Sequence, residues 1–206
     1  MPSLIAHLSA AMRTEFLKNL NYLNIKEYQG FCKKHGIPYS IYVETPTGLK
    51  KTNDKDRKKI VLKKIRHYLN TGKILNPTVF PKSVCKSTKL KNPNPSTRLF
   101  FGQYDKKNGQ FLKVMQSLTD GGFRNGMIAR VVIRDFWTQG IAPTLKEYAK
   151  AWIAADKANT KYHPEAAYLS DLSDGNATPE WKKMRTARAK AAMNILSKIG
   201  PEKHQR

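Results

Sequence analysis

The sequence predicts a mainly α-helical protein, with one small β-ribbon near the N-terminal end and a helical bundle in the C-terminal half. Three observations predict this fold class. Apolar residues recur at the three- and four-residue spacing of an amphipathic helix through most of the chain. Most of these segments begin with a residue that favours helix N-termini and end at glycine or proline. One short segment, residues 39–52, instead alternates like a strand and is rich in β-branched and aromatic residues.

Two helices are predicted at the N-terminal end. Residues 3–22 are predicted to form one helix, because their apolar residues lie on a single stripe and Ser3 can cap the N-terminus. The second helix begins after Asn24, because Glu27 three residues later completes a capping-box pattern. It ends at "HGIP", where Gly36 suits the left-handed C′ position and the proline prevents continuation. Its expected inner face consists of Ile25, Tyr28, Phe31, Cys32 and His35.

A β-ribbon and a basic helix are predicted next. "YSIYVE" alternates as a strand, "TPTG" supplies a type I turn, and "LKKT" can return as a second strand. We expect the following helix to start near Asp54, with Asp54 and Asp56 in or before its first turn, because the helix dipole favours acids there. Gly72 ends it. Val61, Leu62, Ile65, Tyr68 and Leu69 form its apolar stripe, and Lys59, Lys63 and Arg66 line the opposite face.

The chain then divides into a linker and a second helical region. Residues 76–98 contain four prolines and several basic residues without an acid, so they are predicted to be a basic linker or arm. Four helices should follow: around Phe111–Leu118, from Met127 to Thr138, after the capping-box pair Thr144 and Glu147, and after Thr178 and Pro179. The predicted domains are therefore residues 1–75, the linker 76–98, and a C-terminal helical domain at 99–206. In the last helix we expect Trp181, Met184, Ala191 and Ile195 to face inward, and Lys182, Lys183, Arg185, Arg188 and Lys190 outward.

Positive charge is the dominant compositional feature. The 206 residues include 38 Lys and Arg against 15 Asp and Glu, a net charge of +23. Residues 49–91 alone hold 14 basic residues and two acids. Charge on this scale opposes compaction unless an anionic partner relieves it, and nucleic acid is the commonest such partner.

The segment from residue 24 to 72 resembles the SAP module, a short helix–loop–helix unit that binds DNA. The residues that carry the resemblance are those of "FCKKHGIP", then Gly48 and Lys50, then "LKKIRHYL". In that family only a few residues separate the two glycine motifs, whereas "YSIYVETPT" intervenes here. The resemblance implies that Lys50, Lys51, Arg57 and Lys58 contact DNA. The whole chain also resembles bacterial proteins with such a module at the front, which implies no particular activity.

These observations predict a nucleic-acid-binding protein that contacts phosphates through a basic strip. We define the basic strip as Lys50, Lys51, Arg57, Lys58, Lys59, Lys63 and Arg66. Double-stranded DNA is favoured over RNA, because most aromatic residues lie on predicted core faces and not on a stacking surface. The sequence does not indicate base specificity or an oligomeric state.

Three other hypotheses stay open. Glu44, Asp54, Asp56 and Lys58 have the residue types of a metal-dependent nuclease, although the two aspartates also fit as helix-capping acids. The chain could instead bind an acidic protein partner. Residues 127–152 could form a helix-turn-helix that presents Lys146, Lys150 and Lys157, or simply two core helices.

No catalytic residue, metal ligand or cofactor is predicted. Cys32, His35, His67 and Cys85 have the residue types of a zinc site, but their spacing is weak evidence. P-loop, dinucleotide-binding and nucleophile-elbow patterns are absent from the sequence. Two cysteines are too few for a disulfide scaffold, and no apolar run approaches the length of a membrane span. We therefore expect a cytoplasmic protein without membrane contact, associated with the nucleoid if the source is bacterial.

Overall fold

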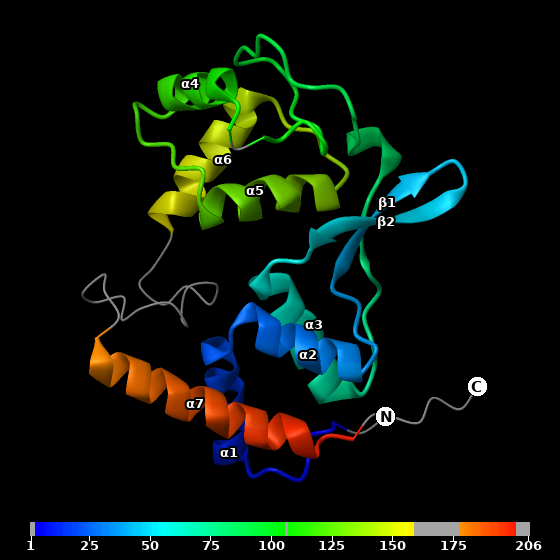
Figure 1. The fold of residues 1–206 in the computed structure, drawn as a ribbon, viewed down its shortest axis with the longest axis vertical. Coiled ribbons are helices and arrows are strands. Elements are labelled where there is room, and N and C mark those ends of the chain that lie inside the picture. The colour runs from blue at the N-terminus through cyan, green and yellow to red at the C-terminus, as the bar shows by residue number, and fades with distance from the viewer. Residues whose placement is uncertain (1–2, 106, 159–177, 201–206) are drawn as a thin grey trace. The chain divides into compact units, whose positions relative to one another are not determined.

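The computed structural model describes residues 3–105, 107–158 and 178–200. The described residues are mainly helical, as predicted, with seven α-helices and one three-stranded sheet (Figure 1). They form two compact units. The described part of unit 1 consists of residues 3–40, 54–77 and 178–200, and that of unit 2 of residues 41–53, 78–105 and 107–158.

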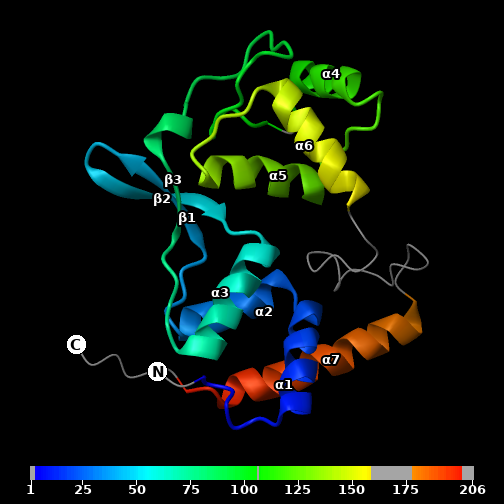
Figure 2. The same cartoon turned by 180° about the vertical axis from the view of Figure 1, so that it is seen from behind.

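Unit 1 is a bundle of four helices. These are α1 (Ala10–Asn19), which a 3-10 turn at Leu20–Tyr22 extends, α2 (Ile25–Lys34), α3 (Lys58–Thr71) and α7 (Pro179–Lys198). Figure 2 shows α7 beside α1. The core between the helices includes Phe16, Leu20, Tyr28, Phe31, Val61, Ile65, Tyr68, Leu69, Ala192 and Leu196.

The predicted boundaries of α2 are confirmed, since local signals determine both ends. The Asn24 side chain accepts from the Glu27 amide at 3.0 Å, and the Glu27 carboxylate accepts from the Asn24 amide. After the helix, Gly36 has φ of +68°, the left-handed conformation that glycine adopts without strain. The inner face is also as predicted, with Tyr28, Phe31, Cys32 and His35 buried and Ile25 partly buried against them.

The first helix is shorter than the sequence predicts. Residues 4–7 form turns, and α1 begins only after Ser9, whose hydroxyl accepts from the Met12 amide at 3.3 Å. Ser3 does not cap a helix: its hydroxyl and the Leu4 amide both donate to the carbonyl of Leu69, at 3.2 and 2.9 Å. The apolar residues Ile5 and Leu8 fill the core from a turn, so their helical spacing was misleading.

The third helix begins later than predicted. Strand β2 (Gly48–Lys55) continues through Asp54, and α3 starts at Lys58 after Arg57 in the N-cap position. Asp56 is buried and lies outside the first turn of the helix. The predicted start near Asp54 is therefore wrong, whereas both aspartates lie before the first turn, within the range that the sequence predicts for them. Gly72 ends α3 with φ of +69°, as predicted.

Unit 2 combines a small sheet with three helices. Strands β1 (Ser40–Thr45) and β2 form the predicted ribbon, and β3 (Thr78–Phe80) joins the other edge of β1 in the order β2–β1–β3. β1 and β3 are parallel, with Ile41 opposite Thr78. The helices are α4 (Gly109–Leu118), α5 (Met127–Thr138) and α6 (Leu145–Lys157). The bounds of α5 and the capping box of Thr144 and Glu147 are confirmed.

The predicted linker is an integral part of unit 2. Residues 78–80 form β3, residues 82–84 form a 3-10 turn, and Val84 and Leu90 are buried in the core of the unit. The Lys86 amide donates to the carbonyl of Phe101 at 2.9 Å, and the Phe101 amide donates to that of Val84 at 2.8 Å. The segment therefore packs along the unit and does not extend from it, because its few apolar residues find partners far along the chain.

The last helix differs from the prediction in its partner and its buried face. The predicted division placed it in the C-terminal domain, whereas α7 packs against α1 and the turn after it, in unit 1. The buried residues are Trp181, Ala189, Ala192 and Leu196, while Ala191 is exposed, so the expected inner stripe was offset. Alanines occur all round this helix and give its apolar stripe little contrast.

Among the described residues, no helix combines the length and apolar character needed to cross a membrane.

Candidate nucleic-acid interface

The side chains of the basic strip differ in exposure: some lie on the surface and others in the interior. Lys50 and Lys51 are exposed on β2, in the part of the strand that belongs to unit 2. Lys59 and Lys63 are exposed on α3 in unit 1, one helical turn apart. The other three members, Arg57, Lys58 and Arg66, are half-buried or buried. Proximity in the sequence therefore does not make the strip one uniform surface.

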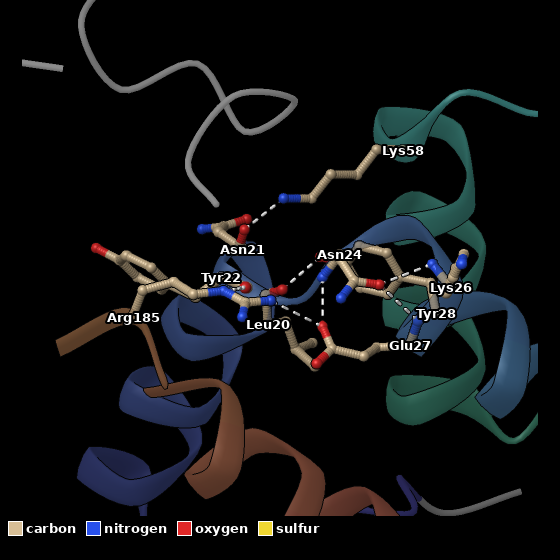
Figure 3. Close-up of polar contacts among 9 residues, drawn as sticks. All are labelled: Leu20, Asn21, Tyr22, Asn24, Lys26, Glu27, Tyr28, Lys58 and Arg185. Atoms are coloured by element: carbon tan, nitrogen blue, oxygen red, sulfur yellow. Dashed lines mark hydrogen bonds and ion pairs between the residues drawn. The ribbon is translucent and has the colours of Figure 1, made fainter. Parts of the chain in front are cut away.

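Lys58 is an internal residue of unit 1. Its side chain is 3% exposed, and its ammonium group donates to the carbonyl of Asn21 (Figure 3). The same nitrogen lies 5.7 Å from the ring centroid of Tyr28, within the range of a cation–π interaction. This side chain joins the N-terminal end of α3 to the segment after α1. Its role in the structure is to hold these two segments together.

Arg66 makes a similar internal contact eight residues further along α3. Its Nη2 atom donates to the carbonyl of Leu17 at 3.0 Å and to the Oδ1 atom of Asn21 at 3.3 Å. The last carbonyls of a helix carry partial negative charge and lack helical partners, so they favour cationic donors. Arg66 satisfies such a carbonyl near the end of α1.

A buried ion pair joins α3 to the segment that precedes it. The Nζ atom of Lys64 is 2.7 Å from the Oδ2 atom of Asp56, and also donates to the carbonyl of Pro38 at 3.1 Å. The two side chains are 6% and 2% exposed. Lys64 was not among the predicted site residues. Asp56 was predicted as a helix cap or a metal ligand, and its carboxylate instead neutralises this lysine.

Arg185 of α7 makes a further internal polar contact in unit 1. Its Nε atom donates to the carbonyl of Tyr22 at 3.2 Å, and its Nη2 atom is 3.2 Å from the carboxylate of Glu27 (Figure 3). At the other end of α7, the ammonium group of Lys34 donates to the carbonyl of Ile199 at 3.1 Å. Arg185 was predicted to face outward, and this prediction is wrong. Cations in unit 1 thus satisfy carbonyls that follow the ends of α1 and α7.

The described residues of unit 1 carry many more cations than acids, and the internal ion pairs leave this difference unchanged, because each removes one cation and one acid. The described residues of unit 1 hold 19 Lys and Arg but five Asp and Glu. Of the five acids, Asp56 is buried against Lys64, and Glu27 bridges the capping box and Arg185. The outer surface of this unit therefore keeps a large excess of positive charge. Such an excess attracts polyanions.

Two helices of unit 1 present lysines on the side away from the core. On α3, Lys59 and Lys63 are exposed together with Asn70, opposite the buried stripe. On α2, Lys26 and Lys33 are exposed on either side of Gly30, opposite Tyr28, Phe31 and Cys32. Each pair follows the helical spacing of a single face. These two faces are outward cationic surfaces of α2 and α3.

In unit 2, α5 and α6 form the pair that the sequence offers as a helix-turn-helix. They pack through buried side chains that include Val132, Ile133, Trp137, Tyr148 and Trp152. The Tyr148 hydroxyl donates to the carbonyl of Ala129 at 2.8 Å, and burial raises the pKa of this phenol. Lys146 and Lys150 are exposed one turn apart on α6. They have the same spacing and charge as the lysine pair of α3.

Among the described residues, neither the candidate nuclease residues nor the candidate zinc ligands form a cluster. Glu44 belongs to unit 2, and its carboxylate accepts from the Lys82 amide at 3.3 Å, whereas Asp54 and Asp56 belong to unit 1. Within residues 3–105, 107–158 and 178–200, no three His, Cys, Asp or Glu side chains are grouped to hold a metal ion.

Two residues of the candidate zinc set have structural roles in unit 1. Cys32 is wholly buried, and burial raises the pKa of its thiol to about 12. The Nδ1 atom of His35 is 3.2 Å from the Tyr68 hydroxyl, and the ring centroids of His35 and Phe31 are 4.2 Å apart. Both side chains therefore belong to the core between α2 and α3.

Comparison with known proteins assigns neither a family nor a function to the chain. No family model matches the chain, and neither a curated protein nor a solved structure is significantly similar to it. An inference about function therefore rests on the charge distribution and the contacts of the chain itself.

One sequence signal could have identified the internal lysines. Lys58 precedes Val61 and Leu62 by three and four residues, so it lies on the apolar stripe of α3. Lys64 lies on the same side, three residues after Val61 and four before Tyr68. A lysine on an apolar stripe has to be paired internally or extend its ammonium group past the core. No comparable local signal identifies Asp56 as the partner of Lys64.

Proposed function

We propose that this protein binds double-stranded nucleic acid, DNA in the first place, through phosphate contacts from exposed lysines. The primary contact surface is the outer face of α3 in unit 1, with Lys59 and Lys63. The exposed ribbon lysines Lys50 and Lys51, in unit 2, provide phosphate contacts of their own. The observation that carries the proposal is the excess of cations in unit 1, where two of the five described acids are engaged in internal contacts. In a bacterial cell this activity would place the protein at the nucleoid.

The mechanism is the release of condensed counterions. Each lysine that pairs with a phosphate frees cations from the DNA, so log K falls with log salt by about 0.9 per contact on duplex DNA. Four contacts, one from each exposed strip residue, give a slope of about −3.6. Phosphate contacts fix position and orientation on the duplex but do not read its sequence. We therefore propose binding without strong sequence preference.

The SAP resemblance is consistent with this choice of surface. The two helices that carry it, α2 and α3, pack against each other in unit 1, and the β1–β2 hairpin connects them in the chain. A helix–extension–helix arrangement of this kind presents one helix and the connecting segment to DNA in the family that the segment resembles. The long connection in this chain forms a strand pair instead of a short loop.

A paired charge reversal tests the proposal. Lys59→Glu with Lys63→Glu should leave the circular dichroism spectrum and melting temperature close to those of the unaltered protein. It should weaken binding to a labelled duplex of about 20 base pairs by 100-fold or more, since two attractive contacts become repulsive.

Lys146→Glu with Lys150→Glu is the matched control, because it makes the same charge change at the same spacing on α6. It should retain most of the affinity. Equal losses in both variants would mean that net charge alone decides binding, and a larger loss in the α6 variant would favour the helix-turn-helix hypothesis. A duplex RNA of the same sequence, measured in parallel, shows which nucleic acid is preferred.

A further inference from the structure

Gly30 is the one glycine among the described residues whose place in the structure has no internal explanation. It lies in the middle of α2, it is exposed, and a Cβ atom built on it would have no atom within 4 Å. The other described glycines have positive φ, stand at or beside a helix end, or press against backbone: Gly36, Gly48, Gly72, Gly102, Gly109, Gly121, Gly122, Gly126, Gly140 and Gly200.

A glycine in this position weakens the helix. Glycine is the least favourable residue in a helix interior apart from proline, because it loses the most backbone freedom on folding. The backbone of Gly30 is helical, so alanine could replace it without strain. Neither the φ angle nor a close neighbour inside unit 1 requires glycine at this position. A missing side chain on an exposed surface does, however, allow another molecule to approach the backbone closely.

The surroundings of Gly30 indicate what kind of molecule this is. Lys26 lies one turn before it and Lys33 one turn after it, and all three are exposed on the face opposite the core. Glu27, the one acid of α2, faces Asn24 and Arg185 (Figure 3). The face therefore consists of two cations with a gap between them, and it carries no negative charge of its own.

The spacing suits the backbone of a nucleic acid. Seven residues of α-helix separate Lys26 from Lys33, about 10.5 Å along the axis at 1.5 Å per residue. Both lysine side chains are long and flexible, so each can reach a phosphate on its own side of Gly30.

We propose that the outer face of α2 is a second phosphate-binding surface, on which the sugar–phosphate backbone lies against Gly30 between the ammonium groups of Lys26 and Lys33. This inference rests on the proposed function and extends it from α3 to α2. Gly30 is a positioning residue: it contributes no charge, and its lack of a side chain lets the strand reach both lysines at once.

Substitutions at Gly30 separate stability from binding. Gly30→Ala should raise the melting temperature by roughly 2 to 4 °C, because it improves helix propensity in open space. Gly30→Gln should also fold at least as stably, yet its longer side chain should hold the strand away from the helix. We expect it to weaken binding to a 20-base-pair DNA duplex by at least about tenfold, the equivalent of ~1.4 kcal/mol.

Gly109→Gln provides the matched control. Gly109 is the first residue of α4, it is exposed, and a Cβ atom there would also have no neighbour within 4 Å. This variant should bind DNA as the unaltered protein does. A parallel variant, Lys26→Gln with Lys33→Gln, should reduce the slope of log K against log salt by about 1.8.

The possible results distinguish the two proposals. If the unaltered protein does not bind the duplex at low salt, the proposed function fails, and this inference fails with it. A different result refutes the α2 surface but not the proposed function. In that result the unaltered protein binds the duplex, Gly30→Gln binds it equally well, and the lysine double variant keeps the same salt slope. A loss confined to Gly30→Gln and the lysine pair, with Gly109→Gln unaffected, supports it.

Discussion

The ammonium group of Lys64 and the carboxylate of Asp56 lie 2.7 Å apart in the interior of unit 1, with both side chains almost completely buried. The pair holds the segment before α3 against the helix, because Asp56 lies two residues before the start of α3 at Lys58 and Lys64 also donates to the carbonyl of Pro38. It also shows that a basic segment need not be a ligand surface. Part of the positive charge of this protein serves the fold.

Removal of one partner from this pair should destabilise unit 1. Asp56→Asn leaves the lysine buried without a counter-charge, and we expect a loss of about 3 to 5 kcal/mol in the free energy of unfolding. Urea unfolding followed by circular dichroism measures this loss. Glu15→Gln, an exposed acid on α1, is the control and should change stability by less than about 0.5 kcal/mol. Equal stability of both variants would contradict a structural role for the pair.

Lys58 should act on stability and not directly on DNA binding. Lys58→Met keeps the aliphatic stem but leaves the carbonyl of Asn21 without its donor, at a cost of about 1 to 3 kcal/mol. Lys63→Met, on the outer face of the same helix, should leave stability within about 0.5 kcal/mol and weaken binding. Unfolding curves and duplex titrations of the two variants would show opposite patterns. If Lys58→Met were as stable as the unaltered protein, the internal role of Lys58 would be wrong.

The stability of unit 1 should depend on the protonation of His35. Burial, and secondarily the charge of Lys34, hold the pKa of His35 below its ordinary value of 6.5, so the folded state favours the neutral ring. Its contribution to stability is complete above pH 6.5 and is lost as the pH falls through the lowered pKa of the folded state. Urea midpoints between pH 7.5 and 5 should decrease less in His35→Asn than in the unaltered protein. His7→Asn, an exposed position, is the control, and an identical pH dependence in His35→Asn would exclude this role.

Helix α7 should be essential for the core of unit 1. Leu196 is 1% exposed, and Leu196→Ala should cost about 2 to 5 kcal/mol through lost burial and the cavity that remains. Met193→Ala, on the exposed side of the helix, should cost much less. The thiol of Cys32 provides a local probe, since it is buried in the same core and should react with a thiol reagent only when unit 1 opens. Faster labelling of Cys32 in Leu196→Ala, measured in a Cys85→Ser background, would confirm the packing of α7; unchanged labelling would contradict it.

The parts of the fold that local signals determine could be predicted from the sequence. The capping boxes at Asn24 and Thr144, the glycine stop at Gly72 and the limits of α5 depend on residues within a few positions of each other. The features that failed depend on partners far along the chain. Ser3 pairs with Leu69, β3 joins β1 in parallel, and α7 joins α1, and no local pattern encodes any of these choices.

The candidate site shows the same limit at the level of single side chains. Lys58 and Lys59 are neighbours in the sequence, yet one is buried against Asn21 and the other is exposed. Helical periodicity separates them once the start of α3 is known, and the sequence placed that start about four residues too early. Gly30 was not singled out from the sequence, because its significance depends on the empty space that the structure shows around it.

Binding to duplex DNA is best tested by fluorescence anisotropy of a labelled duplex of about 20 base pairs, titrated at 50 and 200 mM salt. We expect tight binding at 50 mM salt that weakens by at least about 100-fold at 200 mM, since four phosphate contacts alone imply that loss. The Lys59→Glu and Lys63→Glu double variant should lose this binding, while the α6 double variant should retain it. A duplex that stays unbound at 50 mM salt, or a folded α3 variant with unaltered affinity, would contradict the proposed function.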